Sequence, residues 1–322
     1  MNPLIRIIAI ATLLAMAPWA CAQSYPSKPV RIIIPGAAGA PPDILSRAMG
    51  PAMSQNLGQA WVVENRVGAN GIIGMEAVIR SAPDGYTLSI TQGAPISLNP
   101  YFYSKLPYEP LRDLAPIANM GVIAASILVS ASMPVNSMRE LIDMARAKPE
   151  TLLWSTWGPG SFSDLYRAWT ESYFNVRFQE LPYKASSAAF QSVISGEGQV
   201  MLNASGALTS LAKAGKIKVL ATIGPNRYRT LPDTPSFAEL GYDMDFRGWV
   251  GSFAPAGVSR DIIQRLNVEI NKVLGDAAFD EKFLIPGSVE FKAGTPDEFA
   301  KFLKVDRELA GRLTKLAKVK PE

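Results

Sequence analysis

The stretch Ile33–Leu45, IIPGAAGAPPDIL, joins the end of an apolar strand to the start of a helix through a loop of small and stiff residues. The segment 30–34 ahead of it, apolar except for Arg31, is typical of a buried strand, and residues 44–57 behind it have helical spacing. A strand, a glycine turn and a helix start form the repeating unit of α/β folds. The N–H groups at such a helix start can hold an anion, although a plain tight turn remains the alternative.

The two prolines of this loop limit what it can offer. A residue that precedes proline is pushed out of the helical region, so we expect Pro41 to lie before the helix and Pro42 to be its earliest first-turn position. Neither proline donates a hydrogen bond. The N–H groups left for an anion are those of Gly39, Ala40, Asp43 and Ile44. The side chain of Asp43 would repel an anion if it pointed into a cleft, and we expect it to stabilise its own helix.

The rest of the chain repeats this alternation of strands and helices. Strands are predicted at 30–34, 61–64, 87–91, 152–155, 179–181, 200–202 and 217–223. Two longer apolar stretches, 120–130 and 246–254, enclose the second group of strands. The pattern predicts an α/β protein of two lobes, with the chain crossing over and returning, and the cleft between the lobes is the default ligand site. The predicted lobes are residues 23–123 plus 246–322, and residues 124–245.

The second lobe contains a counterpart of the opening stretch. Residues 153–155 lead into Thr156-Trp157-Gly158-Pro159-Gly160-Ser161-Phe162-Ser163-Asp164, again a strand, a glycine-rich loop and a helix start. Ser161, with Asp164 three residues later, is typical of a helix N-cap. Since each helix N-terminus carries partial positive charge and unpaired N–H donors, we expect the two loops to converge on one carboxylate.

The composition excludes several kinds of chemistry. The chain has no histidine and one cysteine, Cys21. Serine or cysteine triads of the usual kind, ordinary zinc sites and imidazole acid–base catalysis are therefore not expected, and we predict no metal and no cofactor. The net charge of +4 is spread along the chain without a basic run, so nucleic acid is not an expected partner.

The N-terminus has the pattern of a secretory signal. Arg6 precedes the apolar segment 7–17, and Ala20-Cys21-Ala22 supplies the small residues of a cleavage site. We expect residues 1–22 to be removed and the mature chain to be exported to the periplasm. Lipid attachment at Cys21 is the alternative, although Pro18-Trp19-Ala20 is a poor lipidation motif.

The mature chain resembles the Bug-type extracytoplasmic solute receptors of the tripartite tricarboxylate transporter family. The resemblance rests on an ordered series of segments over nearly its whole length: YPSKPVR (25–31), VENRVGANG (63–71), APDGYTL (82–88), NP (99–100), LPY (106–108), PYK (182–184), LPDTP (231–235) and APAG (254–257). It implies a type-2 periplasmic-binding fold that closes around a small organic acid and passes it, as a monomer, to a membrane permease.

The resemblance also implies the ligand-binding positions, where backbone groups and ordered waters hold the ligand. In the first lobe these are Gly39, Ala40, Asp43, Ala94 and Pro95. In the second lobe they are Trp157, Gly158, Gly160, Ser161, Phe162, Tyr183 and Asn203.

Departures from the family pattern bear on the ligand. Gly36 replaces an aromatic residue, Gln199 and Asn203 replace acids, and Asp164 stands where histidine is common. These changes favour an aromatic or monocarboxylate ligand over a tricarboxylate, with Trp157, Phe162 and Tyr183 as stacking surfaces. The expected ligand is thus a mono-, di- or aromatic carboxylate. The alternative is that Trp157 and Phe162 only pack the hinge.

Two other functions remain open at the level of sequence. A receptor of this fold can dock on a membrane sensor kinase instead of a permease. A secreted hydrolase with paired carboxylates is a weaker alternative, because no loop places two acids at a defined separation.

Overall fold

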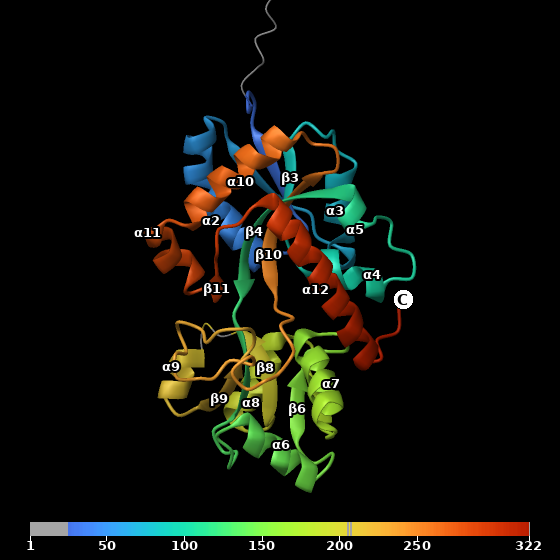
Figure 1. Ribbon diagram of the computed structural model, residues 1–322, viewed down its shortest axis with the longest axis vertical. Coiled ribbons are helices and arrows are strands. Elements are labelled where there is room, and N and C mark those ends of the chain that lie inside the picture. The colour runs from blue at the N-terminus through green and yellow to red at the C-terminus, as the bar shows by residue number, and fades with distance from the viewer. Residues whose placement is uncertain (1–24, 205, 207, 322) are drawn as a thin grey trace, which may run out of the picture.

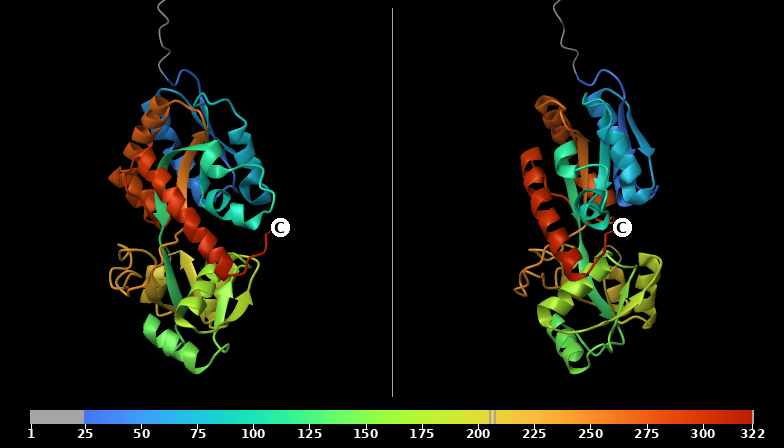
Figure 2. Two further views of the ribbon diagram at one scale, coloured as in Figure 1. Left: turned by 45° about the vertical axis from the view of Figure 1, so that its right-hand side comes forward. Right: turned by 90° about the vertical axis from the view of Figure 1, so that its right-hand side faces the viewer.

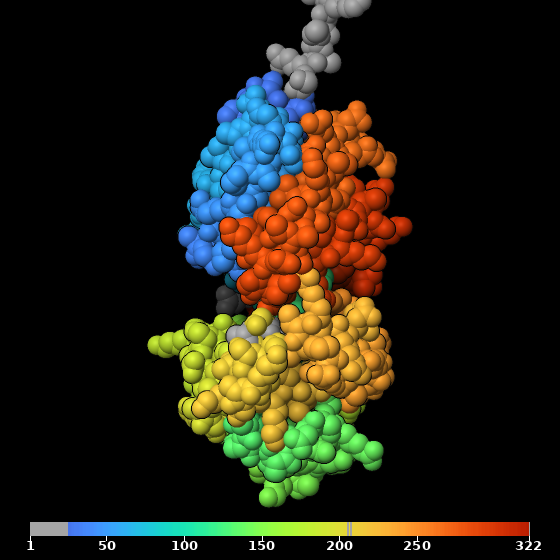
Figure 3. Space-filling view, turned by 90° about the vertical axis from the view of Figure 1, so that its left-hand side faces the viewer, coloured from blue at the N-terminus to red at the C-terminus, as the bar shows by residue number. Residues whose placement is uncertain are grey.

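The computed structural model describes residues 25–204, 206 and 208–321, arranged as two α/β lobes one above the other (Figure 1). The predicted signal peptide and Cys21 lie outside the described residues. The space-filling view shows the constriction where the upper, blue-and-orange part meets the lower, green-and-yellow part (Figure 3). The prediction of an α/β fold with two lobes is confirmed.

The upper lobe is built on a six-stranded mixed sheet. Its order is β11 (Val289–Glu290), β4 (Leu114–Ile123), β10 (Trp249–Pro255), β3 (Thr87–Gln92), β1 (Val30–Ile34) and β2 (Trp61–Asn65). β1 runs parallel to β2 and β3, whereas β10 is antiparallel to β3 and β4. Both faces of the sheet are covered, which explains why β1 is apolar apart from Arg31: Ile32 and Ile34 pack in one cluster and Ile33 in another.

Helices cover the two faces of this sheet. α2 (Pro41–Leu57) and α10 (Arg260–Leu274) lie on one face, and α3 (Ile72–Ile79) and α12 (Pro296–Leu316) on the other. The shorter helical elements are η1 (Ala69–Gly71), η2 (Ala94–Leu98), α4 (Asn99–Phe102), α5 (Pro110–Asp113), α11 (Ala277–Phe279) and η3 (Asp280–Leu284).

The start of α2 differs from the expectation. Ala40 is the N-cap and both Pro41 and Pro42 lie in the first turn. The restriction on a residue before proline is a preference rather than a prohibition, and the first helical positions need no N–H donor. The expectation that Pro41 lies outside the helix was therefore wrong.

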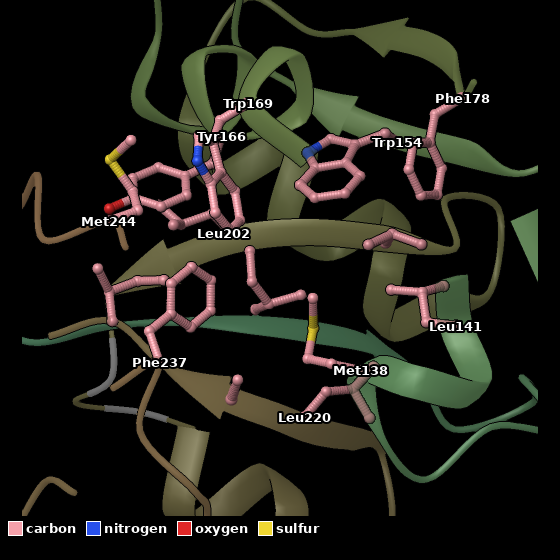
Figure 4. Packing of buried hydrophobic residues seen from close by; sticks show 14 of the residues in the cluster. Met138, Leu141, Trp154, Tyr166, Trp169, Phe178, Leu202, Leu220, Phe237 and Met244 are labelled. Carbon is pink, nitrogen blue, oxygen red and sulfur yellow. The ribbon is translucent and has the colours of Figure 1, made fainter. Parts of the chain in front are cut away.

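The lower lobe contains a five-stranded sheet in the order β7 (Gln179–Pro182), β6 (Leu153–Thr156), β8 (Val200–Ala204), β5 (Ala125–Ser130) and β9 (Ile217–Thr222). Its helices are α6 (Met138–Ala147), α7 (Phe162–Phe174), α8 (Ser186–Ser195) and α9 (Leu208–Lys213). Figure 4 shows the aromatic core, where Trp169 and Tyr166 of α7 face Phe237 and Trp154 packs beside Phe178.

Three segments join the lobes. β4 and β5 are separated only by Ala124, and the chain returns to β10 after Phe246. The long helix α12 also spans the junction (Figure 2): Leu303 packs in a cluster of the upper lobe and Leu313 in the core of the lower lobe. Because α12 is anchored at both ends, it ties the lobes together beside the two connecting strands.

No helix among the described residues has the length and apolar character needed to cross a membrane.

Candidate functional site

A cavity of about 570 Å³ lies where the two lobes meet. The upper lobe contributes Asn70, Gln92, Gly93, Ala94, Leu98, Phe102, Ile123, Gly248 and Trp249. The lower lobe contributes Ala125, Trp157, Pro159, Gly160, Ser161, Phe162, Ser186, Leu202, Asn203 and Ala204. A ligand in this cavity would therefore contact both lobes, which is typical of binding sites at domain junctions.

The upper wall is formed by the turn that follows β3. Gly93 lies against the indole of Trp249, and a Cβ added at Gly93 would come within 2.9 Å of the indole nitrogen. The turn continues directly into η2, whose first residue, Ala94, lines the cavity. Glycine is thus required at position 93 by the close approach of the ring rather than by backbone conformation.

A buried carboxylate holds this wall in place. Asp306 of α12 accepts hydrogen bonds from Trp249 Nε1 at 2.8 Å and from Ser97 Oγ at 2.5 Å. Burial raises the pKa of Asp306 to about 6, and the hydrogen bonds from Ser97 and Trp249 offset only part of that rise. Asp306 therefore connects the helix that bridges the lobes to β10 and to the turn that lines the cavity.

The lower wall is formed by the loop between β6 and α7. Ser161 is the N-cap of α7, and its Oγ accepts from the Asp164 N–H at 3.4 Å. The N–H of Gly160 donates to Asp164 Oδ2 at 2.9 Å. Gly160 has φ +73°, and a Cβ there would come within 2.8 Å of the Phe102 ring. Phe102 belongs to α4 of the upper lobe, so the two lobes approach each other closely at this glycine.

The first loop repeats this construction outside the cavity. The N–H of Gly39 donates to Asp43 Oδ2 at 2.9 Å, the N–H of Ala40 donates to the carbonyl of Ala37 at 3.2 Å, and Arg47 Nε donates to Asp43 Oδ1 at 2.9 Å. Burial would raise the pKa of Asp43, but the hydrogen bonds from Gly39, Asn65 and Arg47 outweigh it and hold that pKa below its usual value. The expected convergence of two free amide clusters is therefore not observed, because each glycine N–H already has a carboxylate from its own helix.

The predicted site residues divide into two groups by position. Those that line the cavity are Ala94, Trp157, Gly160, Ser161, Phe162 and Asn203. Those that do not line it are Gly39, Ala40, Asp43, Pro95, Gly158 and Tyr183.

The residues in the second group have other surroundings. The carbonyl of Pro95 accepts from the hydroxyl of Tyr108 at 3.0 Å, and Tyr183, like Trp157, packs against a buried cluster of the lower lobe. Gln199, singled out as a departure from the family pattern, accepts from the Leu153 N–H at 2.8 Å and so joins the sheet instead of the cavity.

Sequence reasoning missed several of the lining residues, above all Phe102 and Trp249. Trp249 lies in the apolar stretch 246–254, which was interpreted only as a strand, and it is almost fully buried. Phe102 follows Asn99-Pro100, a segment used only for the family resemblance. An aromatic residue that faces a cavity has the same sequence pattern as one that faces a core, so no local signal would have found them.

The described residues contain no group of three or more histidine, cysteine, aspartate or glutamate side chains that could hold a metal ion. The cavity instead offers amides, hydroxyls, backbone groups and aromatic rings. This arrangement can bind a small molecule without reacting with it.

Comparison with known proteins places these features in context. The family model described as "Tripartite tricarboxylate transporter family receptor" matches residues 45–318. The chain is 30% identical to Protein BugT of Bordetella pertussis over 298 residues, covering 92% of this chain and 91% of that protein.

Solved structures agree with this match. A TctC solute binding protein from Polaromonas, determined without ligand, has a TM-score of 0.82 at 25% identity and covers 91% of this chain and 99% of that one. R. palustris Rpa4515 with adipate has a TM-score of 0.75 at 26% identity, covering 92% of this chain and 100% of that one.

Proposed function

Because this chain belongs to the tripartite tricarboxylate transporter receptor family, we propose that it binds a small organic acid between its lobes and delivers it to a membrane permease. It is a solute-binding receptor and not an enzyme. The ligand class is proposed from the relative that was solved with adipate and from the size of the cavity.

The observation that carries the proposal is the composition of the cavity wall. The loop after β3 and the loop after β6 face each other across the junction, and the connecting residues Ile123, Ala125 and Gly248 form part of the wall between them. A ligand that contacts both loops binds more tightly when the two lobes hold both loops against it. It would therefore favour that arrangement of the lobes, since a ligand shifts an equilibrium by its difference in affinity for the two states.

The cellular location and the membrane partner are proposed from the same family. The similar structures include one described as a periplasmic transporter, with 29% identity over 92% of this chain. Together with the predicted signal peptide, this supports a periplasmic receptor whose partners are the membrane subunits of a secondary transporter. The proposed ligand contacts are the predicted residues that line the cavity: Ala94, Trp157, Gly160, Ser161, Phe162 and Asn203.

A thermal-shift screen of the purified mature chain tests the proposal. The panel contains mono-, di-, tri- and aromatic carboxylates with their amides, and native mass spectrometry measures the stoichiometry of each hit. At a ligand concentration of about 100 times Kd, the free energy of unfolding should rise by about 2.7 kcal/mol. One ligand should bind per chain and be recovered unchanged; a panel without any hit, or a product formed from the bound acid, would refute the proposal.

Transport is tested separately with the ligand that the screen identifies. A strain that lacks this protein should lose saturable uptake of that acid, and a plasmid copy should restore it. Unchanged uptake combined with a lost transcriptional response would favour docking on a membrane sensor over delivery to a permease.

A further inference from the structure

Four consecutive residues in a turn of the upper lobe have positive φ angles. The turn includes η1 and the residue before it: Gly68 has φ +130°, Ala69 +45°, Asn70 +53° and Gly71 +88°. Glycine adopts positive φ without steric cost, whereas the conformation is uncommon at other residues. Residues held in this way persist where the surrounding structure fixes them, and they are frequent at ligand clamps. Since Asn70 lines the cavity, this turn is a candidate part of the binding site.

The turn is fixed from behind by buried contacts. A Cβ added at Gly71 would come within 2.8 Å of Pro95 Cγ and 3.0 Å of the Pro35 carbonyl oxygen, so the backbone packs tightly between these two prolines. The carbonyl of Asn70 accepts a hydrogen bond from Asn99 Nδ2 at 3.1 Å. Asn99 is the first residue of α4 and is fully buried. The position of Asn70 at the cavity is therefore set by groups that a ligand does not reach.

The side chain of Asn70 has no partner of its own. It is exposed at the cavity, and its amide makes no hydrogen bond with any residue that the structure describes. In the lower lobe, Asn203 of β8 also lines the cavity, and its amide likewise has no partner among the described residues. A carboxamide nitrogen can donate two hydrogen bonds, and those to a charged acceptor are the stronger kind. Each amide can thus donate to a ligand carboxylate from its own lobe.

Asn70 is better suited to this role than the other upper-lobe groups. The backbone amides of Gly39 and Ala40 donate to groups of their own loop and helix, and neither residue lines the cavity. Among the upper-lobe lining residues that the structure describes, the side-chain amides are those of Asn70 and Gln92. Gln92 has one more rotatable bond, so ordering it against a ligand costs more side-chain entropy. The short side chain of Asn70 is mounted on a fixed turn, and this preorganisation favours affinity.

We infer that the side-chain amide of Asn70 binds the ligand carboxylate from the upper lobe, and that Asn99 is the positioning residue that holds it there. The inference rests on the proposed function and adds a ligand contact to it. It follows from three observations: the place of Asn70 on the cavity wall, its unpartnered amide, and a turn of positive φ held by buried contacts.

Isothermal titration calorimetry of the mature chain at neutral pH tests the contact. Succinate, adipate, citrate and benzoate are titrated first, and the acid that binds the wild type most tightly is the probe. If none of the four binds, the tightest hit of the thermal-shift panel takes its place. Asn70→Gly removes the amide and leaves a residue that adopts positive φ without steric cost. The Kd for the probe should rise about tenfold or more, because a hydrogen bond to a charged group is lost.

A matched control is available in the lower lobe. Asn175 follows α7 with φ +51° and does not line the cavity. Asn175→Gly therefore makes the same chemical change at a similar backbone conformation, and the Kd should be the same as in the wild type. Urea unfolding checks that both glycine variants are folded.

The variant Asn70→Asp tests whether the side chain faces the carboxylate of the ligand. Aspartate has the size of asparagine and also tolerates positive φ, but it is ionised at neutral pH. Two carboxylates held close together repel each other. The Kd should therefore be at least about threefold higher in Asn70→Asp than in Asn70→Gly.

The variant Asn99→Ala tests positioning. Without the Nδ2 donor the Asn70 carbonyl is released, and the Kd in the wild-type background should rise about threefold or more. In the Asn70→Gly background the same change should leave the Kd unaltered, because no amide remains to be positioned. The urea midpoint should fall in both backgrounds, so a purely structural role is distinguished from positioning.

The outcomes separate this inference from the proposed function. If Asn70→Gly binds the probe as tightly as the wild type, or Asn70→Asp as tightly as Asn70→Gly, the role of Asn70 is overturned while the receptor function stands. If Asn99→Ala changes the Kd equally in both backgrounds, or in neither, Asn99 is not a positioning residue. If no acid of the thermal-shift panel binds the wild type, the proposed function itself fails.

Discussion

The loop before α2 and the loop before α7 are built alike but lie in different surroundings. In each, a glycine N–H donates at 2.9 Å to an aspartate four residues later, and that aspartate pairs with an arginine of the same helix. Only the second loop lines the cavity. Gly160 lies against Phe102 of the other lobe, whereas a Cβ at Gly39 would meet nothing within 4 Å.

The comparison shows what a glycine-rich strand-to-helix turn does and does not specify. The turn and its aspartate satisfy the orphan N–H groups of the helix start, which is a local requirement met in both loops. Whether such a loop also reaches a ligand depends on the element that faces it from another part of the chain. The predictions below test the two loops and the other contacts that hold the lobes, beginning with the largest effect.

Alanine at the two glycines should separate the loops most clearly. Both have positive φ, which costs an alanine about 1 to 2 kcal/mol. Gly160→Ala also places a Cβ within 2.8 Å of Phe102, and overpacking of this kind adds about 1 to 3 kcal/mol. Denaturant unfolding should therefore show a loss of about 2 to 5 kcal/mol for Gly160→Ala, and about 1 to 2 kcal/mol for Gly39→Ala.

Equal losses of unfolding free energy in Gly160→Ala and Gly39→Ala would contradict a close contact between Gly160 and Phe102 across the lobes. The double variant Gly160→Ala with Phe102→Ala provides the control, since shortening the ring should relieve the overpacking and leave the cost of the positive φ. If the double variant is no better than the sum of the singles, Phe102 is not the limiting contact.

A third buried aspartate, Asp306, should respond to pH in the opposite direction from Asp43. Burial raises the pKa of Asp306 to about 6, so between about pH 4 and pH 6 the folded state holds a proton that the unfolded state has released. The unfolding free energy should fall as pH rises through this window, by up to about 3 kcal/mol, and then level off.

The variant Asp306→Asn should no longer lose unfolding free energy as pH rises from about 4 to about 6. For Asp43 the sign is reversed: the hydrogen bonds from Gly39, Asn65 and Arg47 overcome the effect of burial and lower its pKa, so its stabilising contribution is lost as pH decreases. Asp43→Asn should therefore reduce acid sensitivity at the low end of the range. Urea titrations from pH 3 to 8 measure both effects, and an unchanged slope in Asp306→Asn would show that this carboxyl is ionised throughout.

Removing the two loop aspartates tests whether their local roles are the same. Asp43→Ala and Asp164→Ala each leave a glycine N–H without its carboxylate, and each should cost about 1 to 2 kcal/mol in unfolding free energy. The costs should agree within about 1 kcal/mol, although only Asp164 lies behind the cavity wall. A much larger loss at Asp164 would mean that its ion pair with Arg167 stabilises the lower lobe beyond the helix start.

The sequence predicted several strands well because these are largely apolar segments bounded by turns. The segments 30–34 and 217–223 correspond to β1 and β9 within one residue. The stretch 120–130 was predicted as one extended segment, and it contains the end of one strand and the start of another, divided at Ala124. Hydropathy cannot show this division, because both strands are buried and the chain hardly turns between them. The exact bounds of the lobes stay a prediction.

The site was predictable only in part, and the reason is physical. Loop chemistry brought in Gly160 and Ser161, the family resemblance brought in Asn203, and all three line the cavity. The predicted N-cap at Ser161 is confirmed. Gly39, which both loop chemistry and the resemblance indicated, and Tyr183, which the resemblance brought in, do not line the cavity, while Phe102 and Trp249 were missed. Which face of a loop meets a cavity depends on how two lobes approach, and this involves contacts between residues far apart in the chain.

The smallest predicted effect concerns an ion pair that joins the lobes away from the cavity lining. Arg229, in the segment after β9, donates both guanidinium ends to Asp280 of η3, at 2.5 and 2.8 Å. The Arg229 side chain is 46% exposed and that of Asp280 26%, so solvent screens the pair, and a double-mutant cycle with Arg229→Ala and Asp280→Ala should give a coupling of about 0.5 to 1 kcal/mol. High salt should reduce this coupling further. A coupling above about 2 kcal/mol would mean that this pair, and not the packed lobe contacts at Gly160 and along α12, dominates the junction.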